Sequence, residues 1–287
     1  LKFIDIAGPV EGASQGQGLG NQFLGHIRNV DAIAHVVRLF QSPDVVHVAG
    51  RVAPTTDLDI IMTELMLADL DMLEKRLDKA RKMARSNDPD VKLELDLMRE
   101  FAARLAEGQR PTWDKSDLKV DATAKALGLI SAMPAFICAN TDEETFRNFA
   151  DDANARALRE YAEGHGMEVI PVCAKLEDEL GQLDPEEAKM FMEELGISET
   201  GLTKVIHTGY RLLNYITFFT AGPMEARAWT VTAGTPAPQA AGKADNSRDT
   251  KNSTQTGQQI DTQARAIQAR TNGTYGHTRG SLLNVLV

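Results

Sequence analysis

The sequence predicts an α/β protein in which a parallel sheet with flanking helices is interrupted by an antiparallel helical hairpin. Short runs rich in Val and Ile alternate with segments of helical character, as in parallel sheets. A repeat of apolar residues between residues 57 and 107 is typical of two helices packed together. With 287 residues, of which 43% are apolar and 25% charged, the chain has the balance of an ordinary globular protein and can bury more than one core.

The first part of the sheet is predicted within residues 1–56. A short apolar strand at Leu1–Ile6 leads into a glycine-rich loop, which we expect to be mobile. Asn21 can cap a helix that runs to about Asn29, and Ala32–Phe40 follows as a second buried strand. Strand, glycine loop, helix and strand in this order are a fragment of a parallel α/β sheet.

Residues 57–110 are predicted to form an inserted coiled-coil hairpin. Their apolar residues are spaced alternately four and three apart, which creates a seam that needs a partner helix. A break at Ser86–Pro89 places a capping carboxylate at Asp88 and a proline at the first helical position, and Gly108 ends the second helix. The residues of the seam are Met66, Leu70, Leu73, Leu77, Ala80, Ala84, Val91, Leu95, Met98, Ala102 and Leu105.

The sheet resumes in residues 111–205, the second part of the same domain. The predicted elements there are a strand at Ala135–Ala139, a helix over about Glu144–Glu163, a strand at Glu168–Val172 and helices at Pro185–Leu195 and Leu202–Leu213. Residues 206–242 contain two strands, Tyr215–Thr220 and Glu225–Thr232, and form a separate small unit. Residues 243–287 have few large apolar side chains, so we expect a polar, disordered tail.

The net charge of −10 is unevenly distributed. Residues 243–287 carry six basic and three acidic residues, so the body of the chain is strongly acidic. An acidic body argues against binding nucleic acid over the whole surface, although a local basic patch remains possible. One such patch lies near the hairpin tip, where basic side chains could contact nucleic acid or form a solvated helix face. Its residues are Lys75, Arg76, Lys79, Arg81, Lys82 and Arg85.

Two widely separated cysteines, Cys138 and Cys173, form no disulfide framework, which suits a reducing compartment. The sequence also has no stretch of eighteen uncharged apolar residues and no secretion signal at its start. We therefore expect a cytoplasmic protein without a membrane partner.

The first candidate motif is Asp5-Ile6-Ala7-Gly8, at the end of the first predicted strand. In phosphate-binding enzymes an Asp in this position holds Mg²⁺, while the unhindered Gly amide donates to a γ-phosphate. Taken alone, the motif is weak, because an Asp at the end of a strand followed by a loop Gly is more often an ordinary turn.

The second and third motifs also follow apolar strands. In Asn140-Thr141-Asp142-Glu143 the Asn amide can pair with a purine edge, and the alternative is a helix cap with acidic first-turn residues. In Cys173-Ala174-Lys175 the small residue lets the backbone approach a base, and the Lys stem can lie along its face. The alternative for this motif is a plain strand exit with a buried cysteine.

The three motifs, in this order, resemble the nucleotide site of the Obg-like ATPases, the YchF family of translation-factor-related P-loop NTPases. The resemblance covers residues 1–242, and the helical hairpin lies at the insertion point of that family. The segments that carry the resemblance are Phe3–Gly25, His47–Val52, Thr63–Asp71, Pro171–Lys175, Phe191–Gly196 and Phe218–Gly242. The fold class then becomes a partial P-loop NTPase followed, at residues 206–242, by an incomplete β-grasp TGS module.

The resemblance implies a role for each motif. Asp5 would hold Mg²⁺, and Gly8 would contact the γ-phosphate within a switch loop. Asn140 and Thr141 would belong to the base site. Glu143 stands where guanine-specific relatives have Asp, and the family favours ATP over GTP. Cys173, Ala174 and Lys175 would close the base pocket.

A histidine is the candidate for positioning water. The family has a hydrophobic residue in place of a catalytic glutamine, and here that position is Pro9. His47 matches a family histidine that could orient the attacking water; the alternative is a surface-loop histidine without a role.

Two departures from the family pattern stand out. The pattern Gly-x-x-x-x-Gly-Lys-[Ser/Thr], which cradles phosphates, does not occur, and the chain begins within the family pattern at the strand bearing Asp5. After Gly242 the family continues through β-strands, whereas this chain becomes polar. We therefore expect a chain that is truncated before the Asp-x-x-Gly motif and divergent at its other end.

The function that the resemblance implies is hydrolysis of ATP with Mg²⁺, as a switch associated with the ribosome or its RNA and without reading of DNA sequence. The alternatives are GTP hydrolysis and an inactive fragment that only contacts protein or RNA. All readings that involve a nucleotide require Asp5, Asn140 and Lys175 to face one crevice.

Overall fold

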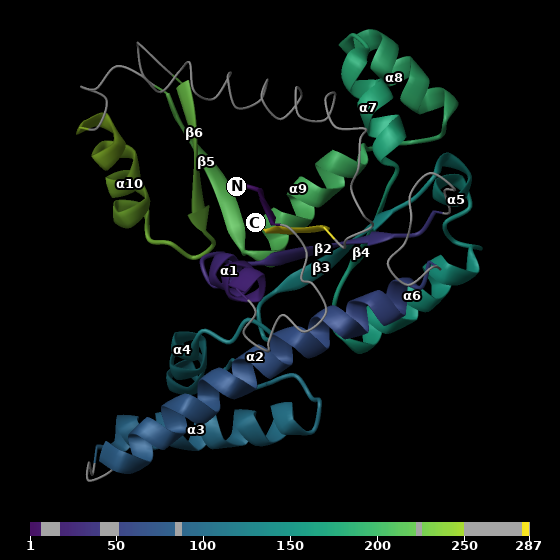
Figure 1. Cartoon of the computed structure of the whole chain (residues 1–287). Helices are drawn as coiled ribbons and strands as arrows, with labels where there is room; N and C mark the ends of the chain where they lie inside the picture. The colour runs from purple at the N-terminus through teal and green to yellow at the C-terminus, as the bar shows by residue number, and fades with distance from the viewer. Residues whose placement is uncertain (7–17, 41–51, 84–87, 222–225, 250–282, 287) are drawn as a thin grey trace.

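The computed structural model describes residues 1–6, 18–40, 52–83, 88–221, 226–249 and 283–286. These residues form two sheets with flanking helices (Figure 1). The strands are β1 (Ile4–Ile6), β2 (Ile33–Arg38), β3 (Ala135–Asn140), β4 (Val169–Val172), β5 (Tyr215–Ala221), β6 (Ala226–Thr232) and β7 (Leu283–Leu286). The helices are α1 (Gly18–Ile27), α2 (Pro54–Met83), α3 (Pro89–Ala106), α4 (Leu118–Leu127), α5 (Glu143–Arg147), α6 (Ala153–Gly164), α7 (Ala174–Gln182), α8 (Pro185–Glu194), α9 (Gly201–Leu212) and α10 (Ala237–Asp249).

The larger sheet has the strand order β1-β7-β2-β3-β4 among the described residues. β2, β3 and β4 are parallel, whereas β7 is antiparallel to both of its neighbours. β1 and β2 therefore run in the same direction, as predicted for a parallel α/β sheet. The carboxyl ends of the parallel strands point to one edge, which is where such sheets bind their ligands.

The inner strand β7 departs from the expectation for the tail. Residues 243–287 were expected not to fold, but α10 continues to Asp249 and Leu283–Leu286 form a strand of the main sheet. The backbone of β7 pairs with β1 on one side and β2 on the other. Its pairing satisfies two strand edges that would otherwise lie open. Composition alone did not indicate this because the pairing depends on distant segments.

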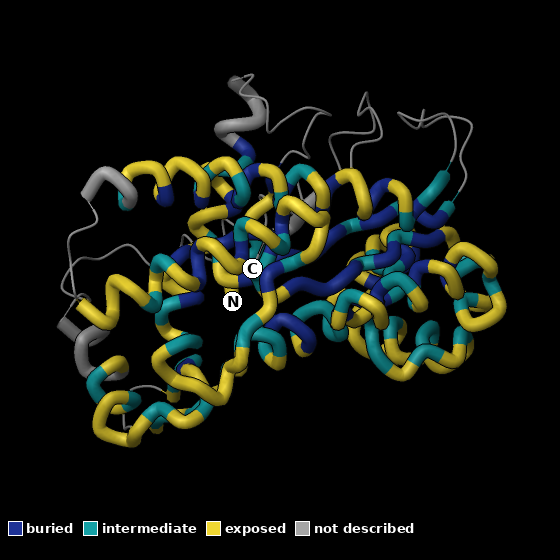
Figure 2. Tube along the Cα trace, turned by 90° about the horizontal axis from the view of Figure 1, so that it is seen from below, coloured by how far each residue is buried: buried dark blue, intermediate teal, exposed yellow. Residues whose placement is uncertain are grey.

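Both faces of the main sheet are covered by helices, and its strands β2 and β3 are largely buried (Figure 2). Side chains of α1, α2 and α6, such as Ile27, Leu65 and Leu158, pack on one face in a single apolar cluster. Phe136 and Ile170 point to the other face, against α9. Burial on both faces explains why the strands read as near-continuous apolar runs in the sequence.

The predicted hairpin is present as α2 and α3, which extend away from the sheet (Figure 1). Leu73, Leu97 and Phe101 form its core together with Leu127 of α4. As predicted, the Asp88 side chain caps α3, where it accepts a hydrogen bond from the Asp90 amide at 2.9 Å.

A buried carboxylate fastens the hairpin to the sheet domain. Asp69 of α2 is fully buried, and its side chain accepts hydrogen bonds from the Ile130 amide, the Ser131 amide and the Ser131 hydroxyl at 3.1, 2.8 and 2.6 Å. Burial raises the pKa of Asp69, although the bonds from Ser131 and Ile130 oppose that shift. These bonds hold the middle of α2 against the segment that leads into β3.

The predicted helix over residues 144–163 is two helices, α5 and α6. Asp142 caps the first and Asp152 caps the second, each accepting a hydrogen bond at 2.8 Å from an amide three residues on. Helices α4 and α7 are additional to the predicted elements. Among the described residues, none of the helices is long and apolar enough to cross a membrane.

Candidate functional site

The ends of three parallel strands meet at one edge of the sheet. Arg38 of β2 pairs with Asn140 of β3, and Asn140 pairs with Val172 of β4. Two further hydrogen bonds close the edge: the Leu39 amide donates to the Asn140 carbonyl at 2.8 Å, and the Thr141 amide donates to the Val172 carbonyl at 2.9 Å. The loops that follow β3 and β4 therefore leave the sheet side by side.

An ion pair joins these two loops. Lys175 Nζ lies 2.7 Å from Glu143 Oε1, and the two side chains are 69% and 37% exposed. The hydrogen bond and the charge of Lys175 lower the pKa of Glu143, and Glu143 in turn raises the pKa of Lys175. The structure thus brings the second and third predicted motifs together, with their charged ends accessible to solvent.

Other residues of these motifs hold the loops in place. Thr141 is buried, and its hydroxyl lies 3.3 Å from the Val172 carbonyl, to which it donates. Cys173 is also buried, and burial raises the pKa of its thiol. Its backbone is extended, with φ −101° and ψ 101°, so that Ala174 begins α7 directly at the edge. The Asp142 side chain acts as a helix cap, the alternative that the sequence left open.

Asp5 lies on the same sheet but farther from this edge. Through Val285 of β7 it is level with Ala34 of β2, whereas Asn140 is level with Arg38. The four-residue offset corresponds to roughly 13 Å along the strands, and three strand spacings add roughly 14 Å across the sheet. The structure therefore brings Asn140, Glu143 and Lys175 together, and the expected crevice would have to span this separation to include Asp5 as well.

The remaining candidates, Gly8 and His47, lie outside the described residues. Asp5 is the one proposed metal ligand that can be assessed, and its side chain is exposed. No group of three or more His, Cys, Asp or Glu residues in the described part of the chain is arranged to hold a metal ion. Mg²⁺ commonly uses only one or two protein carboxylates together with water and substrate phosphates, and a single exposed carboxylate fits that requirement.

Two features of the edge were not anticipated from the sequence. Arg38 ends β2 directly beside Asn140, and its guanidinium lies over the Phe40 ring at 4.5 Å. A cavity of about 250 Å³ lies close by and is lined in part by Phe146, Pro171 and Leu176. The only sequence signal for Arg38 is a cation at the end of a Val-rich strand, a common arrangement in any sheet.

Several known proteins are similar to this chain. A family model described as YchF-GTPase_C, protein of unknown function (DUF933), matches residues 215–248, the segment of β5, β6 and α10. The chain is 44% identical over 244 residues to the ribosome-binding ATPase YchF of Escherichia coli O157:H7, covering 85% of this chain and 66% of that protein. It is 43% identical over 246 residues to the protein of the same name from Bacillus subtilis, with 84% and 66% covered.

A solved structure shows the same fold. The Schizosaccharomyces pombe YchF GTPase superposes with a TM-score of 0.69 at 30% identity, covering 84% of this chain and 73% of that one. The chain spans 66% of the length of the two bacterial relatives. Sequence identity, the matched segment and the shared fold agree, and the chain belongs to the YchF family.

Proposed function

We propose that this chain binds ATP at the edge formed by β3 and β4 and takes part in hydrolysis of the γ-phosphate, as a nucleotide-dependent switch associated with the ribosome in the cytoplasm. The observation that supports this most directly is the Lys175–Glu143 pair beside Asn140. It places an amide, a carboxylate and a long cationic side chain around one edge of a parallel sheet. Relatives named ribosome-binding ATPases support the ribosomal role.

The base would be recognised by Asn140 and Lys175. The Asn140 amide offers both a donor and an acceptor to the edge of a purine, and the Lys175 stem can lie along its face. Guanine requires a carboxylate that accepts from its N1–H and its exocyclic amine together. Glu143 is one methylene longer than Asp and is already bonded to Lys175, which favours adenine over guanine at this position.

The phosphate end of the site would involve Asp5, Gly8 and His47. Asp5 would hold Mg²⁺, which when bound neutralises phosphate charge, while the Gly8 amide would donate to the γ-phosphate and His47 would orient water. The phosphate-cradling Gly-x-x-x-x-Gly-Lys-[Ser/Thr] pattern is not present in the 287 residues. Because that loop supplies most of the phosphate contacts, we expect weak binding and slow turnover by this chain alone.

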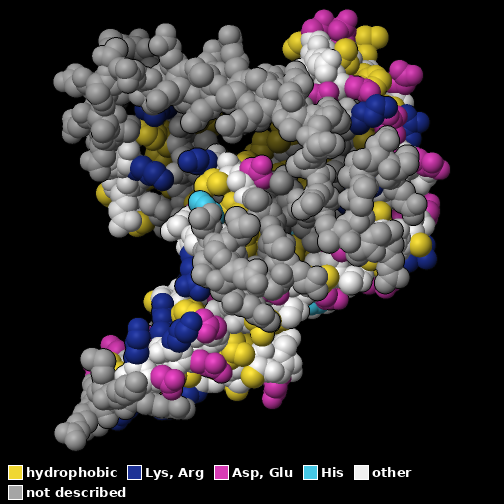
Figure 3. Space-filling view, viewed as in Figure 1, with side chains coloured by type: hydrophobic (Ala, Val, Ile, Leu, Met, Phe, Trp, Pro, Cys, Tyr) yellow, Lys and Arg dark blue, Asp and Glu magenta, His cyan; other side chains and the backbone are white. Residues whose placement is uncertain are grey.

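The hairpin is the proposed contact with ribosomal RNA. Lys and Arg side chains gather where α4 lies beside the hairpin, with Asp and Glu side chains next to them (Figure 3). Lys75, for example, is 71% exposed and paired with Asp71 at 2.6 Å, a surface pair that RNA phosphates can replace at little cost.

The nucleotide proposal is tested by equilibrium binding of a fluorescent N-methylanthraniloyl derivative of ATP in the presence of MgCl₂. We expect saturable binding that ATP displaces at lower concentration than GTP. Asn140→Ala should weaken binding about tenfold, since it removes both base contacts of the amide. Asn148→Ala, in an exposed side chain beyond α5, is the matched control and should bind like the unchanged protein.

Three other results of this binding experiment would each change the proposal. Displacement by GTP at lower concentration than ATP would replace the ATPase proposal with a GTPase. Equal binding by Asn140→Ala and the unchanged protein would refute the assignment of the base site. If no saturable binding occurs while the chain still cosediments with ribosomes, the chain acts as an interaction module without a nucleotide.

A further inference from the structure

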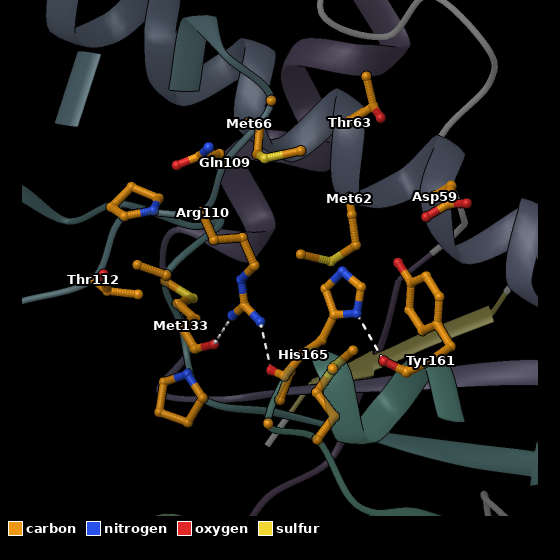
Figure 4. A pocket seen from close by; sticks show the side chains of 18 of the residues that line it. Asp59, Met62, Thr63, Met66, Gln109, Arg110, Thr112, Met133, Tyr161 and His165 are labelled. Atoms are coloured by element: carbon orange, nitrogen blue, oxygen red, sulfur yellow. Dashed lines mark hydrogen bonds between the residues drawn. The ribbon is translucent and has the colours of Figure 1, made fainter. Parts of the chain in front are cut away.

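We propose that a second cavity, at the opposite edge of the main sheet, binds a small organic anion with an aromatic or planar apolar body. The cavity has a volume of about 910 Å³, within the range of small-molecule sites. It lies between α2, the segment that follows α3, and the turns that lead into β3 and β4 (Figure 4). Pro134 and Met167 line it at the amino ends of strands whose carboxyl ends carry the candidate nucleotide site.

The anionic group would bind at Arg110. This partly buried guanidinium donates to three backbone carbonyls: Nε to Ser131 at 2.8 Å, Nη1 to His165 at 3.2 Å and Nη2 to Met133 at 3.4 Å. In the described part of the chain no carboxylate lies within ion-pair distance of it. Burial lowers the pKa of Arg110, as expected for a cation without a counter-ion. Of its five N–H groups two remain for a ligand, and an anion would compensate the buried charge.

A planar body would fit the apolar part of the cavity. Tyr161 and His165 stack with ring centroids 4.1 Å apart and an interplanar angle of 20°, and both line the cavity. The thioethers of Met62, Met66 and Met133 lie around them (Figure 4). Methionine side chains adapt to irregular shapes and make favourable contacts with aromatic rings.

Two polar atoms beside this stack remain available to the ligand. The buried Tyr161 hydroxyl has no hydrogen bond of normal geometry. Burial, and then the nearby Asp59 carboxylate, raise the pKa of Tyr161, which stays a neutral donor. His165 Nδ1 lies 2.7 Å from the Tyr161 carbonyl and must donate to it. Nε2 is the ring nitrogen that remains for a ligand, and a ligand hydroxyl or amide could satisfy both groups.

The charges on the wall favour an anionic group at the Arg110 end. Lys115 also lines the cavity and adds a second positive charge, whereas Asp59 lines it near Tyr161. The anionic group of the ligand, a carboxylate or a phosphate ester joined to a ring, would therefore lie at Arg110.

The fluorescence of Trp113, which lines the cavity, can report binding. The sequence has two tryptophans, and Trp229→Phe leaves Trp113, which lines the cavity, as the only reporter. In this background we would titrate phenyl phosphate and benzoate, with benzyl alcohol and benzylamine as neutral and cationic probes of similar size. The two anions should give a saturable change in fluorescence and bind at least about tenfold more tightly than the other probes.

Variants assign the binding to the proposed groups. Arg110→Gln should weaken anion binding by at least about tenfold, and Tyr161→Phe by about threefold to tenfold for a probe bearing a ring hydroxyl, such as 4-hydroxybenzoate. Arg159→Gln is the matched control, because Arg159 of α6 is exposed and bonds the Ala150 carbonyl outside the cavity. It should bind both anions unchanged.

The proposal is overturned if neither anion gives a saturable response in a folded protein, or if benzylamine binds as well as benzoate. It is also overturned if folded Arg110→Gln binds the anions as before. Should Arg110→Gln fail to fold, Thr63→Phe carries the test, because it fills the cavity from α2 without removing a hydrogen bond of Arg110. Unchanged anion binding by Thr63→Phe would then refute the site.

Discussion

The bonds of Asp69 give the sharpest stability prediction. Asp69→Ala removes the acceptor of three donors, the amides of Ile130 and Ser131 and the Ser131 hydroxyl, all at a fully buried position. The bonds join residues more than sixty positions apart in the chain, so no local interaction replaces them. The variant should loosen the contact between the middle of α2 and the segment leading into β3.

The magnitude follows from the donors left without partners. A buried donor that loses its acceptor costs about 1–3 kcal/mol, and water entering the new space recovers part of this. We expect Asp69→Ala to lower the free energy of unfolding by about 4 kcal/mol. Asp69→Asn keeps one carbonyl oxygen, so its cost should be about half as large. Asp71→Ala is the matched control on the same helix, because Asp71 is 59% exposed and pairs only with Lys75, at a cost below about 0.5 kcal/mol.

Urea unfolding followed by circular dichroism measures this difference. For an m-value of about 2.5 kcal/mol per molar urea, the midpoint of Asp69→Ala should fall by about 1.5 M relative to the unchanged protein. The midpoint of Asp71→Ala should stay almost where it is. If Asp69→Ala and Asp71→Ala unfold at the same urea concentration, the buried carboxylate does not fasten the hairpin to the sheet.

Three further predictions follow from the site and the core. Lys175→Ala should raise the pKa of Glu143 toward its ordinary value, because the Lys175 hydrogen bond lowers it; a carbon-detected NMR titration that shows no change would contradict the ion pair. Burial raises the pKa of Cys138 to about 12 and also raises that of Cys173, so both thiols should react slowly with an aromatic disulfide reagent at pH 8 and fully in urea. Fast labelling of the native protein would argue against the burial of Cys173 and the partial burial of Cys138. Phe101→Ala should cost about 4 kcal/mol in urea unfolding, since Phe101 is 0% exposed in the hairpin core, whereas Phe219→Ala, at 76% exposed, should cost almost nothing; similar midpoints for the two would refute this core.

Local signals explain what the sequence could predict of the fold. The heptad spacing and the Asp88-Pro89 pair define the hairpin, since both act within one or two helical turns. Helix α7 was not predicted because its N-cap residue, Cys173, makes no side-chain capping hydrogen bond. Strand β7 was not predicted because it is defined by its pairing with the sequence-distant strands β1 and β2. A segment of four mostly apolar residues does not by itself indicate such pairing.

The candidate site shows the same limit. Parallel strands bring their carboxyl ends to one edge, so the meeting of Asn140, Glu143 and Lys175 could be anticipated from order alone. The position of Asp5 could not, because it depends on the register that β7 imposes. The cavity around Arg110 gave no sequence signal either, since its walls come from five separate segments.

The place of β7 also affects how the protein is made. β1 and β7 lie at opposite ends of the described chain, yet within the described sheet β1 pairs only with β7. During synthesis β1 leaves the ribosome well before β7 and can pair with it only after the residues between the two strands have been made. Contacts of such long sequence separation form slowly and leave strand edges exposed in the meantime. A nascent chain would therefore acquire the carboxylate of Asp5 in its final place only after β7 has been made.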